Sequence, residues 1–354
     1  MKRYSEVVLN GHPDKFCDLV ADRIILTANR CDPNTHAQIE VAVWSDVLFL
    51  TGAIVTQNKI DIDITKIIHQ LGKEIGYTAN NFIDVKQYKI LDHICRVQQD
   101  PGLWTKYTND QAIIIGYAGY DPLTRFLPPE HFLAWYFREK LIQSISSGTL
   151  KGNGPDGKIL VMMVEDSSGW RIQKLLVTLQ QKESEPFLVF TEKVLACLNA
   201  SYQELQAVDE RWNNDWSDIE VHINPNGPFI EAGSEGDNGQ TGRKLVMDYY
   251  GPRIPIGGGA LYGKDLTHID RLGSKMARRF ALDMVQSGAK DAIIKVCYMP
   301  GSPVPMSVDI QSDKKPSTDP YQFFNFENML KAVRLEDMEY DLEGVGSFYG
   351  LQKF

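Results

Sequence analysis

The sequence has no long apolar run, no excess of basic residues and little cysteine, and each of these absences excludes a class of protein. Its longest apolar stretches are only a few residues, far short of the roughly 20 that a membrane-spanning helix needs. Lys and Arg total 37 against 46 Asp and Glu, which gives a formal net charge of -9. Non-specific binding to nucleic acid or anionic lipid is therefore not expected, and an anionic ligand would need a local basic site.

The five cysteines are odd in number, widely scattered and without a CxxC pair. This spacing favours free thiols over a disulfide framework. The first 15 residues also lack the apolar core of a signal peptide. We therefore expect a reducing compartment and a cytoplasmic location.

A length of 354 residues with 43% apolar side chains is sufficient to bury two or three domain cores. Strand-like and helix-like patterns form three successive units, which we place at residues 1–100, 101–219 and 220–354. The strands and helices do not alternate strictly, so the pattern predicts an α+β fold and not a doubly wound parallel sheet.

Local periodicity predicts most of the elements within these units. Residues 89–110 are polar and contain Pro101-Gly102, which indicates an irregular loop near a boundary. Residues 220–263 are rich in glycine, which is typical of a functional loop region. Helices are predicted directly after His12, within 56–80 and over 130–145, 190–204 and 266–286, and strands within 38–55 and over 112–118, 158–165, 171–179, 291–298 and 304–310.

Two glycine-rich segments, residues 152–158 and 258–264, nearly match a P-loop. Each ends in a lysine, Lys158 or Lys264, but the next residue lacks the hydroxyl that holds Mg²⁺ in that motif. A P-loop ATPase is therefore not predicted. Each segment still offers flexible backbone amides beside a lysine, which suits anionic oxygens, although an ordinary loop with a solvated lysine is the simpler alternative.

Arg243 and Lys244 follow a further glycine run and place two cations in a small volume. A planar guanidinium and a compact ammonium together suit a polyphosphate. Asp14, Asp237 and Asp270 lie in or beside the same motifs, and Mg²⁺ is usually held by one or two carboxylates plus substrate phosphates. A magnesium nucleotide is thus one interpretation, while each Asp alone is also typical of a helix cap or turn.

Five segments resemble, in order and at similar separations, the signature segments of the S-adenosylmethionine synthetase (methionine adenosyltransferase) family. The resemblance covers the whole chain, and five ordered motifs are far more specific together than any one of them alone. The segments are GHPDKFCD at 11–18, TNDQAIIIGYA at 108–118, GPDGK at 154–158, GSEGDNGQTGRK at 233–244 and GGGALYGKD at 257–265.

The resemblance implies three similar α+β domains about a pseudo-threefold axis. It also implies a homodimer or a dimer of dimers with active sites at the subunit interface. The implied reaction is attack by the sulfur of L-methionine on C5′ of ATP, followed by cleavage of the released tripolyphosphate to pyrophosphate and phosphate. Preorganised cations and metal ions would neutralise the charge that develops on the leaving group.

The matched positions imply a set of site residues. His12 would contact the departing phosphate oxygen and act in catalysis with the four cations, while Mg²⁺ and K⁺ would be the metal cofactors. The triphosphate would be held by Lys158, Arg243, Lys244 and Lys264, Mg²⁺ by Asp14 and Asp270, K⁺ by Glu40, and ATP or the amino acid by Gln98, Asp110, Phe229, Asp237, Ala260 and His268.

The departures from the family pattern fall mainly at the amino-acid end of the implied site. Ala53 replaces a glutamate that meets the methionine amino group, and His268 replaces a lysine. Either Val97 or Gln98 occupies the position of a methionine-contacting glutamine, depending on a one-residue alignment choice. Other departures are Asn10, Pro228, Ile256, a short loop over 100–110 and the tail at 344–354.

The sequence therefore leaves three hypotheses for the function. The favoured one is a divergent S-adenosylmethionine synthetase. The second is a homologous enzyme that uses ATP with a different acceptor or as a triphosphate hydrolase. The third, a non-catalytic nucleotide-binding paralogue, is disfavoured because His12 and the four phosphate-binding cations all remain.

Overall fold

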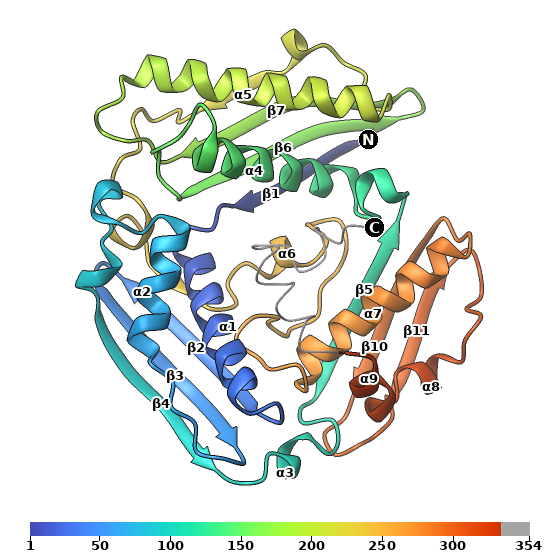
Figure 1. Cartoon of the computed structure of the whole chain (residues 1–354). Coiled ribbons are helices and arrows are strands. Elements are labelled where there is room, and N and C mark those ends of the chain that lie inside the picture. The colour runs from blue at the N-terminus through green and yellow to red at the C-terminus, as the bar shows by residue number, and fades with distance from the viewer. Residues whose placement is uncertain (334–354) are drawn as a thin grey trace.

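The computed structural model describes residues 1–333, and within them the predicted α+β class is confirmed, because helices pack against three separate sheets. The divergent tail at 344–354 lies outside the described residues. Figure 1 shows the three sheets arranged around a central segment that contains α6 (Leu245–Asp248). Over residues 1–333, no helix is long and apolar enough to cross a membrane.

One sheet has the strand order β4-β3-β2-β9, and α1 and α2 pack on one of its faces. Alternate residues of β2, among them Ile39 and Val41, are buried against these helices, so the opposite face of the sheet carries the polar residues. The elements are α1 (Pro13–Cys31), β2 (His36–Trp44), β3 (Val47–Thr56), α2 (Ile64–Ile75), β4 (Lys89–Gln98) and β9 (Gly239–Gln240).

A second sheet has the order β1-β6-β7-β8 and is covered by α4 and α5. The predicted hairpin between β6 and β7 is confirmed, and Gly169 at its turn has a φ of 124°, which favours glycine. The elements are β1 (Lys2–Val8), α4 (Pro129–Ser147), β6 (Gly157–Asp166), β7 (Gly169–Leu179), α5 (Phe187–Val208) and β8 (Glu220–Ile223).

The third sheet has the order β11-β10-β5 and packs against α7, with two short helices closing its core. The elements are β5 (Ala112–Gly119), α7 (Ile269–Gln286), β10 (Asp291–Tyr298), β11 (Ser307–Ser312), α8 (Pro320–Phe323) and α9 (Phe326–Ala332). The remaining short helices are η1 (Ala79–Asn81), η2 (Val85–Gln87), α3 (Gly102–Thr105), η3 (Pro122–Thr124), η4 (Trp216–Asp218) and η5 (Gly233–Glu235).

Each of the three sheets pairs strands that are far apart in the sequence. β1 joins β6, β5 joins β10, and β9 joins β2. Each sheet therefore contains strands from more than one of the predicted ranges 1–100, 101–219 and 220–354. This pairing brings glycine-rich loops from the C-terminal part of the chain beside the first helix.

The structure differs from the local predictions at several strands: β8 and β9 lie within the predicted loop region 220–263, β11 begins three residues later than predicted, and β4 and β1 differ most. Residues 89–98, predicted as loop, form β4, a strand at the sheet edge that pairs in parallel with β3. Its polar sequence reflects this position, since only Ile94 is fully buried along it. Residues 2–8 form β1 without having been predicted as a strand, and their partner β6 is about 150 residues away in the sequence.

Candidate active site

The first cluster of predicted site residues lies at the N-terminus of α1, as the sequence indicated. His12 is the N-cap residue, and its Nδ1 accepts a hydrogen bond from the backbone N–H of Asp14 at 3.2 Å. Pro13 occupies the first helical position, where no N–H is needed. These two residues fix where the helix begins and hold the Asp14 carboxylate beside the His12 ring.

The loop before α6 brings two cations to Asp14. Lys244 donates to Asp14 Oδ2, and Arg243 Nε lies 3.5 Å from Oδ1. The backbone N–H of Gln240 donates to Oδ1 at 2.9 Å. Asp14 is therefore a buried anion that gathers cations and an amide from a segment more than 220 residues away.

The charge state of His12 follows from these neighbours. Burial and, after it, the charge of Lys244 lower the pKa of His12 from 6.5 to about 4, and Lys158 acts in the same direction. The ring is thus neutral at neutral pH. Because Nδ1 accepts the capping bond, the ring proton lies on Nε2, which leaves a hydrogen-bond donor for an anionic oxygen.

A cavity of about 550 Å³ opens beside this cluster. It is lined by Lys158 at the start of β6, by Arg243 and Lys244, and by Tyr4 and Glu6 of β1. Asp237 is close enough to His12 to raise its pKa. We call His12, Asp14, Lys158, Asp237, Arg243 and Lys244 the α1 cluster.

The second cluster repeats this arrangement at the N-terminus of α7. His268 is the N-cap residue, and its Nδ1 accepts from the backbone N–H of Asp270 at 3.3 Å. The imidazole and carboxylate lie 3.9 Å apart at this helix start, as they do at His12 and Asp14. The sequence pattern His-x-Asp thus builds the same local geometry twice.

Lys264 supplies the cation of the second cluster by donating to Asp270 Oδ2. Asp110, His268 and Asp270 each offer a ligand atom within 4.8 Å of the others, which makes them a group that could hold a metal ion. Burial, followed by the charge of Lys264, lowers the pKa of His268. Burial raises the pKa of Glu40, against the influence of Lys264. We call Glu40, Asp110, Lys264, His268 and Asp270 the α7 cluster.

The two clusters are separate places within one chain. Asp14 and Asp22 both lie on α1, and Asp22 contacts the loop that carries Lys264. Eight residues at 1.5 Å per residue separate them by about 12 Å along the helix. One copy of the chain therefore gathers its predicted site residues at two helix starts, and the loops that carry them touch where Ala260 lies against Gly242.

Three predicted ligand-binding residues lie outside both clusters. Gln98 pairs with Thr56, which places it on the sheet face opposite to Glu40 and Ala53; it lines a different cavity with Ile60. Phe229 contacts Gln181 through its backbone carbonyl. Ala260 lies against Gly242, since a Cβ on that glycine would be 3.0 Å from the Ala260 Cβ.

The sheet register places the two candidates for the glutamine position on opposite faces of the sheet. Val97 pairs with Val55, two residues from Ala53, so Val97 and Ala53 share the face that carries Glu40. Ala53 and Val97 therefore lie on the face of the sheet that carries Glu40, and Gln98 lies on the opposite face.

The sequence-based prediction did not include several buried charged residues around the clusters. Asp156 of the GPDGK segment accepts from Gly233 N–H at 2.7 Å, and burial raises its pKa to about 7. Asp18 and Asp22 follow Asp14 at intervals of four residues, and that spacing was the signal that they share its helix face. Arg271 bonds to Asp22.

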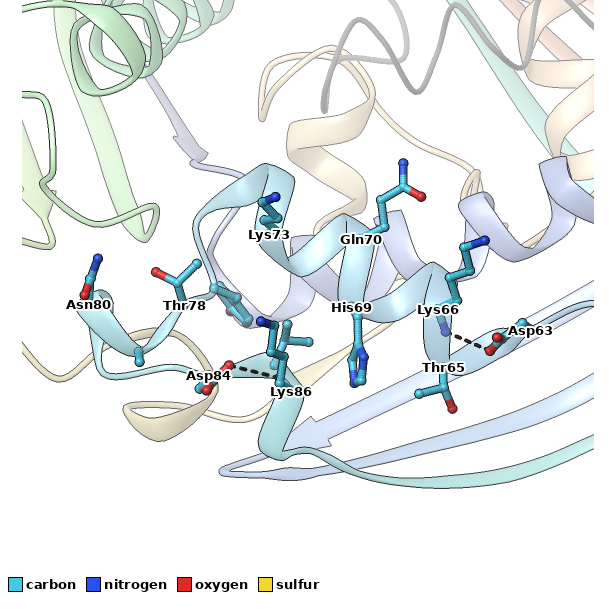
Figure 2. A pocket seen from close by; sticks show the side chains of 13 residues that line it. Asp63, Thr65, Lys66, His69, Gln70, Lys73, Thr78, Asn80, Asp84 and Lys86 are labelled. Carbon is cyan, nitrogen blue, oxygen red and sulfur yellow. Dashed lines mark hydrogen bonds between the residues drawn. The ribbon is translucent and has the colours of Figure 1, made fainter.

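A further cavity of about 810 Å³ lies elsewhere (Figure 2). It lies between α2 and residues 77–86 and is lined by polar side chains, among them Lys73 and Lys86. No residue of the α1 or α7 cluster lines it. This cavity is therefore distinct from both clusters.

Comparison with known proteins gives two family models that match the sequence. The model of the S-adenosylmethionine synthetase N-terminal domain matches residues 2–99, and that of the C-terminal domain matches residues 232–343. The S-adenosylmethionine synthase of Borrelia garinii subsp. bavariensis is 32% identical over 320 residues, which cover 87% of this chain and 80% of the relative. That of Borreliella afzelii is 32% identical over 318 residues, covering 86% and 79%.

Proposed function

The chain belongs to the S-adenosylmethionine synthetase family, and we propose that it is a methionine adenosyltransferase that forms S-adenosylmethionine from ATP and L-methionine. The observation that carries this proposal is the pair of cation and carboxylate clusters at the N-termini of α1 and α7. The α1 cluster comes from the segments that resemble the family's signature motifs, and the α7 cluster takes Asp110 and Lys264 from them.

The reaction requires stabilisation of the leaving triphosphate. The methionine sulfur attacks C5′ of ATP, the C5′–O bond breaks, and negative charge collects on the bridging oxygen and its phosphates. Lys158, Arg243 and Lys244 line one cavity and would hold these oxygens. His12 would donate from Nε2 to the departing oxygen. Fixed donors aimed at developing charge are often worth several kcal/mol.

The carboxylates fit the proposed metal ions. Asp14 and Asp270 would hold Mg²⁺, because carboxylate oxygens are its preferred protein ligands and Asp270 lies in a group with the spacing of a metal site. When bound, Mg²⁺ would neutralise phosphate charge. Glu40 would hold K⁺, and a cation there would favour the charged form of a carboxylate whose pKa burial raises.

We also propose a homodimer, or a dimer of dimers, in which each active site combines the α1 cluster of one subunit with the α7 cluster of the other. The separation of the two clusters within one chain supports this. The face of β2 and β3 that carries Glu40 also exposes an apolar residue, Phe49, at 40%. A second copy of the chain would cover this face. The cytoplasmic location stays part of the proposal.

The test is to incubate the purified protein with ATP, Mg²⁺, K⁺ and L-methionine and to analyse the products by mass spectrometry. We expect S-adenosylmethionine, pyrophosphate and phosphate in equal amounts. Consumption of ATP without a sulfonium product would instead favour another acceptor or triphosphate hydrolysis. Absence of any turnover, with ATP still bound, would favour the non-catalytic paralogue.

A further inference from the structure

We propose that the buried ion pair between Asp22 and Arg271 is a positioning device, which holds Lys264 and Asp270 of the α7 cluster in their working geometry. The inference rests on the proposed function, because it assigns a role to two residues that do not themselves reach the substrate. It is drawn from the contacts that α1 makes with the glycine-rich loops.

The buried face of α1 carries three aspartates four residues apart, Asp14, Asp18 and Asp22. One oxygen of each accepts a backbone N–H from a glycine-rich loop. The donors are Gln240 to Asp14 at 2.9 Å, Gly242 to Asp18 at 2.9 Å and Gly263 to Asp22 at 2.8 Å. Successive turns of one helix thus set the positions of both loops.

Asp22 and Arg271 extend this contact to the α7 cluster. Both side chains are fully buried, and the guanidinium meets the carboxylate with two bonds of 2.8 Å. Arg271 Nη1 also donates to the backbone carbonyl of Lys264 at 2.8 Å. Arg271 directly follows Asp270 on α7. One ion pair therefore connects α1 to the residues on both sides of the Lys264–Asp270 contact.

The backbone of β2 also bonds to the loop that carries Lys264, on the side opposite to α1. Ile39 N–H donates to the carbonyl of Gly263 at 2.7 Å, and Asp265 N–H donates to the carbonyl of Ala37 at 3.0 Å. A Cβ on Gly263 would overlap the Ile39 carbonyl oxygen. The backbone on both sides of Lys264 is therefore enclosed between α1 and β2, and this leaves its side chain as the part that can respond to a ligand.

Stability alone does not account for this ion pair. Buried ion pairs are often no more stabilising than apolar side chains of similar volume, since desolvation opposes the attraction. A planar guanidinium, by contrast, fixes direction at both of its partners. Displacement of a reacting group by about 1 Å can lower a rate about 10²-fold, so loss of this geometry should appear in turnover.

Three variants test the proposal. Arg271→Lys keeps the positive charge but loses the bidentate contact with Asp22. Asp22→Leu combined with Arg271→Met removes both charges together, which leaves neither unpaired. Arg23→Lys is the matched control, because Arg23 is the next residue on α1 and forms an exposed ion pair with Glu74 at 2.9 Å. Unfolding in urea, kcat, and KM for ATP and methionine would be measured for each.

We expect Arg271→Lys to lower kcat about 10²-fold with little change in the KM for methionine, and Arg23→Lys to behave like the wild type. The double variant should unfold at a somewhat lower urea concentration than the wild type, because the Gly263 N–H and the Lys264 carbonyl lose their partners, and its kcat should stay low. If the double variant has the wild-type kcat, or if Arg271→Lys keeps the wild-type kcat, the pair is only structural. Should the double variant not fold, the two lysine variants decide the question.

A separate measurement distinguishes failure of the positioning proposal from failure of the proposed function. Calorimetry of inorganic triphosphate binding in the presence of Mg²⁺ requires no turnover. If the wild type makes no S-adenosylmethionine, the proposed function fails, while at least tenfold weaker triphosphate binding by Arg271→Lys would still support the positioning role. Unchanged binding in that case would overturn it.

Discussion

Gly259 lies directly against the carboxylate of Asp270, and this contact allows a precise test of the α7 cluster. An ideal Cβ built on Gly259 would overlap Asp270 Cγ and would be 2.5 Å from Oδ2. Carbon atoms in contact normally lie about 3.5–4.0 Å apart. The Gly259→Ala variant must therefore displace the Asp270 carboxylate by about 1 Å, which also separates it from Lys264.

The displaced atoms are the end of a rotatable side chain, so the backbone need not move and the fold should tolerate the change. We expect a melting temperature within about 2 °C of the wild type, since a change below 1 kcal/mol shifts it by only a few degrees. Turnover should fall about 10²-fold because a metal or phosphate ligand is misplaced. This loss equals about 2.7 kcal/mol of transition-state stabilisation.

The neighbouring Gly258 supplies a matched control, because a Cβ there would meet no atom within 4 Å. Gly258→Ala makes the same change in backbone freedom in the same loop and should keep most of the activity. The assay is the rate of S-adenosylmethionine formation at saturating ATP and methionine, with the melting curve of each variant. Equal losses in both variants would show that loop flexibility matters and not the position of Asp270. Wild-type rates in both would refute a role for that position.

Three further predictions follow from the same contacts. Lys264→Ala or Arg243→Ala should lower kcat by about 10²–10³-fold with an unchanged circular dichroism spectrum, whereas Lys73→Ala, in the cavity of Figure 2, should not. Burial lowers the pKa of His131 to about 4, so its neutral form favours folding above pH 6.5 and this contribution falls as the pH drops; between pH 7 and 5 the wild type should lose about 2 kcal/mol more unfolding free energy than His131→Gln. Phe49→Asp should weaken the dimer in light scattering, while Leu188→Asp on the exposed side of α5 should not.

Local patterns predicted the elements whose apolar residues recur along one face. The helix after His12 and the β6–β7 hairpin are found where periodicity and turn residues placed them. β4 was missed because an edge strand with one buried residue shows no alternation. The pairing of β1 with β6 depends on contacts across the chain, which local periodicity does not record.

The site residues, like the strands and helices, include some that local sequence patterns identified and some that only the tertiary structure shows. Motif positions identified the residues that meet at the two helix starts, because the glycines, the N-cap histidines and the neighbouring aspartates are close in the sequence. Asp18, Asp22 and Arg271 were missed because charged residues on a helix usually face solvent. Only the packing of loops from residues 239–265 onto α1 shows why three aspartates occupy its buried face.

The two helix starts also explain how the fold accommodates His268 at the position where the family resemblance implies a lysine. A preferred N-cap side chain accepts a hydrogen bond from the helix N-terminus, and a lysine has no acceptor. His268 accepts from Asp270 N–H as His12 accepts from Asp14 N–H, so the substitution adds a cap and fixes the following carboxylate. The cost is one cation, because burial lowers the pKa of His268 and favours its neutral form. The resemblance to the family thus implies that His268 brings a neutral hydrogen-bond donor where the family has a cation, on the same side of the proposed site as Ala53.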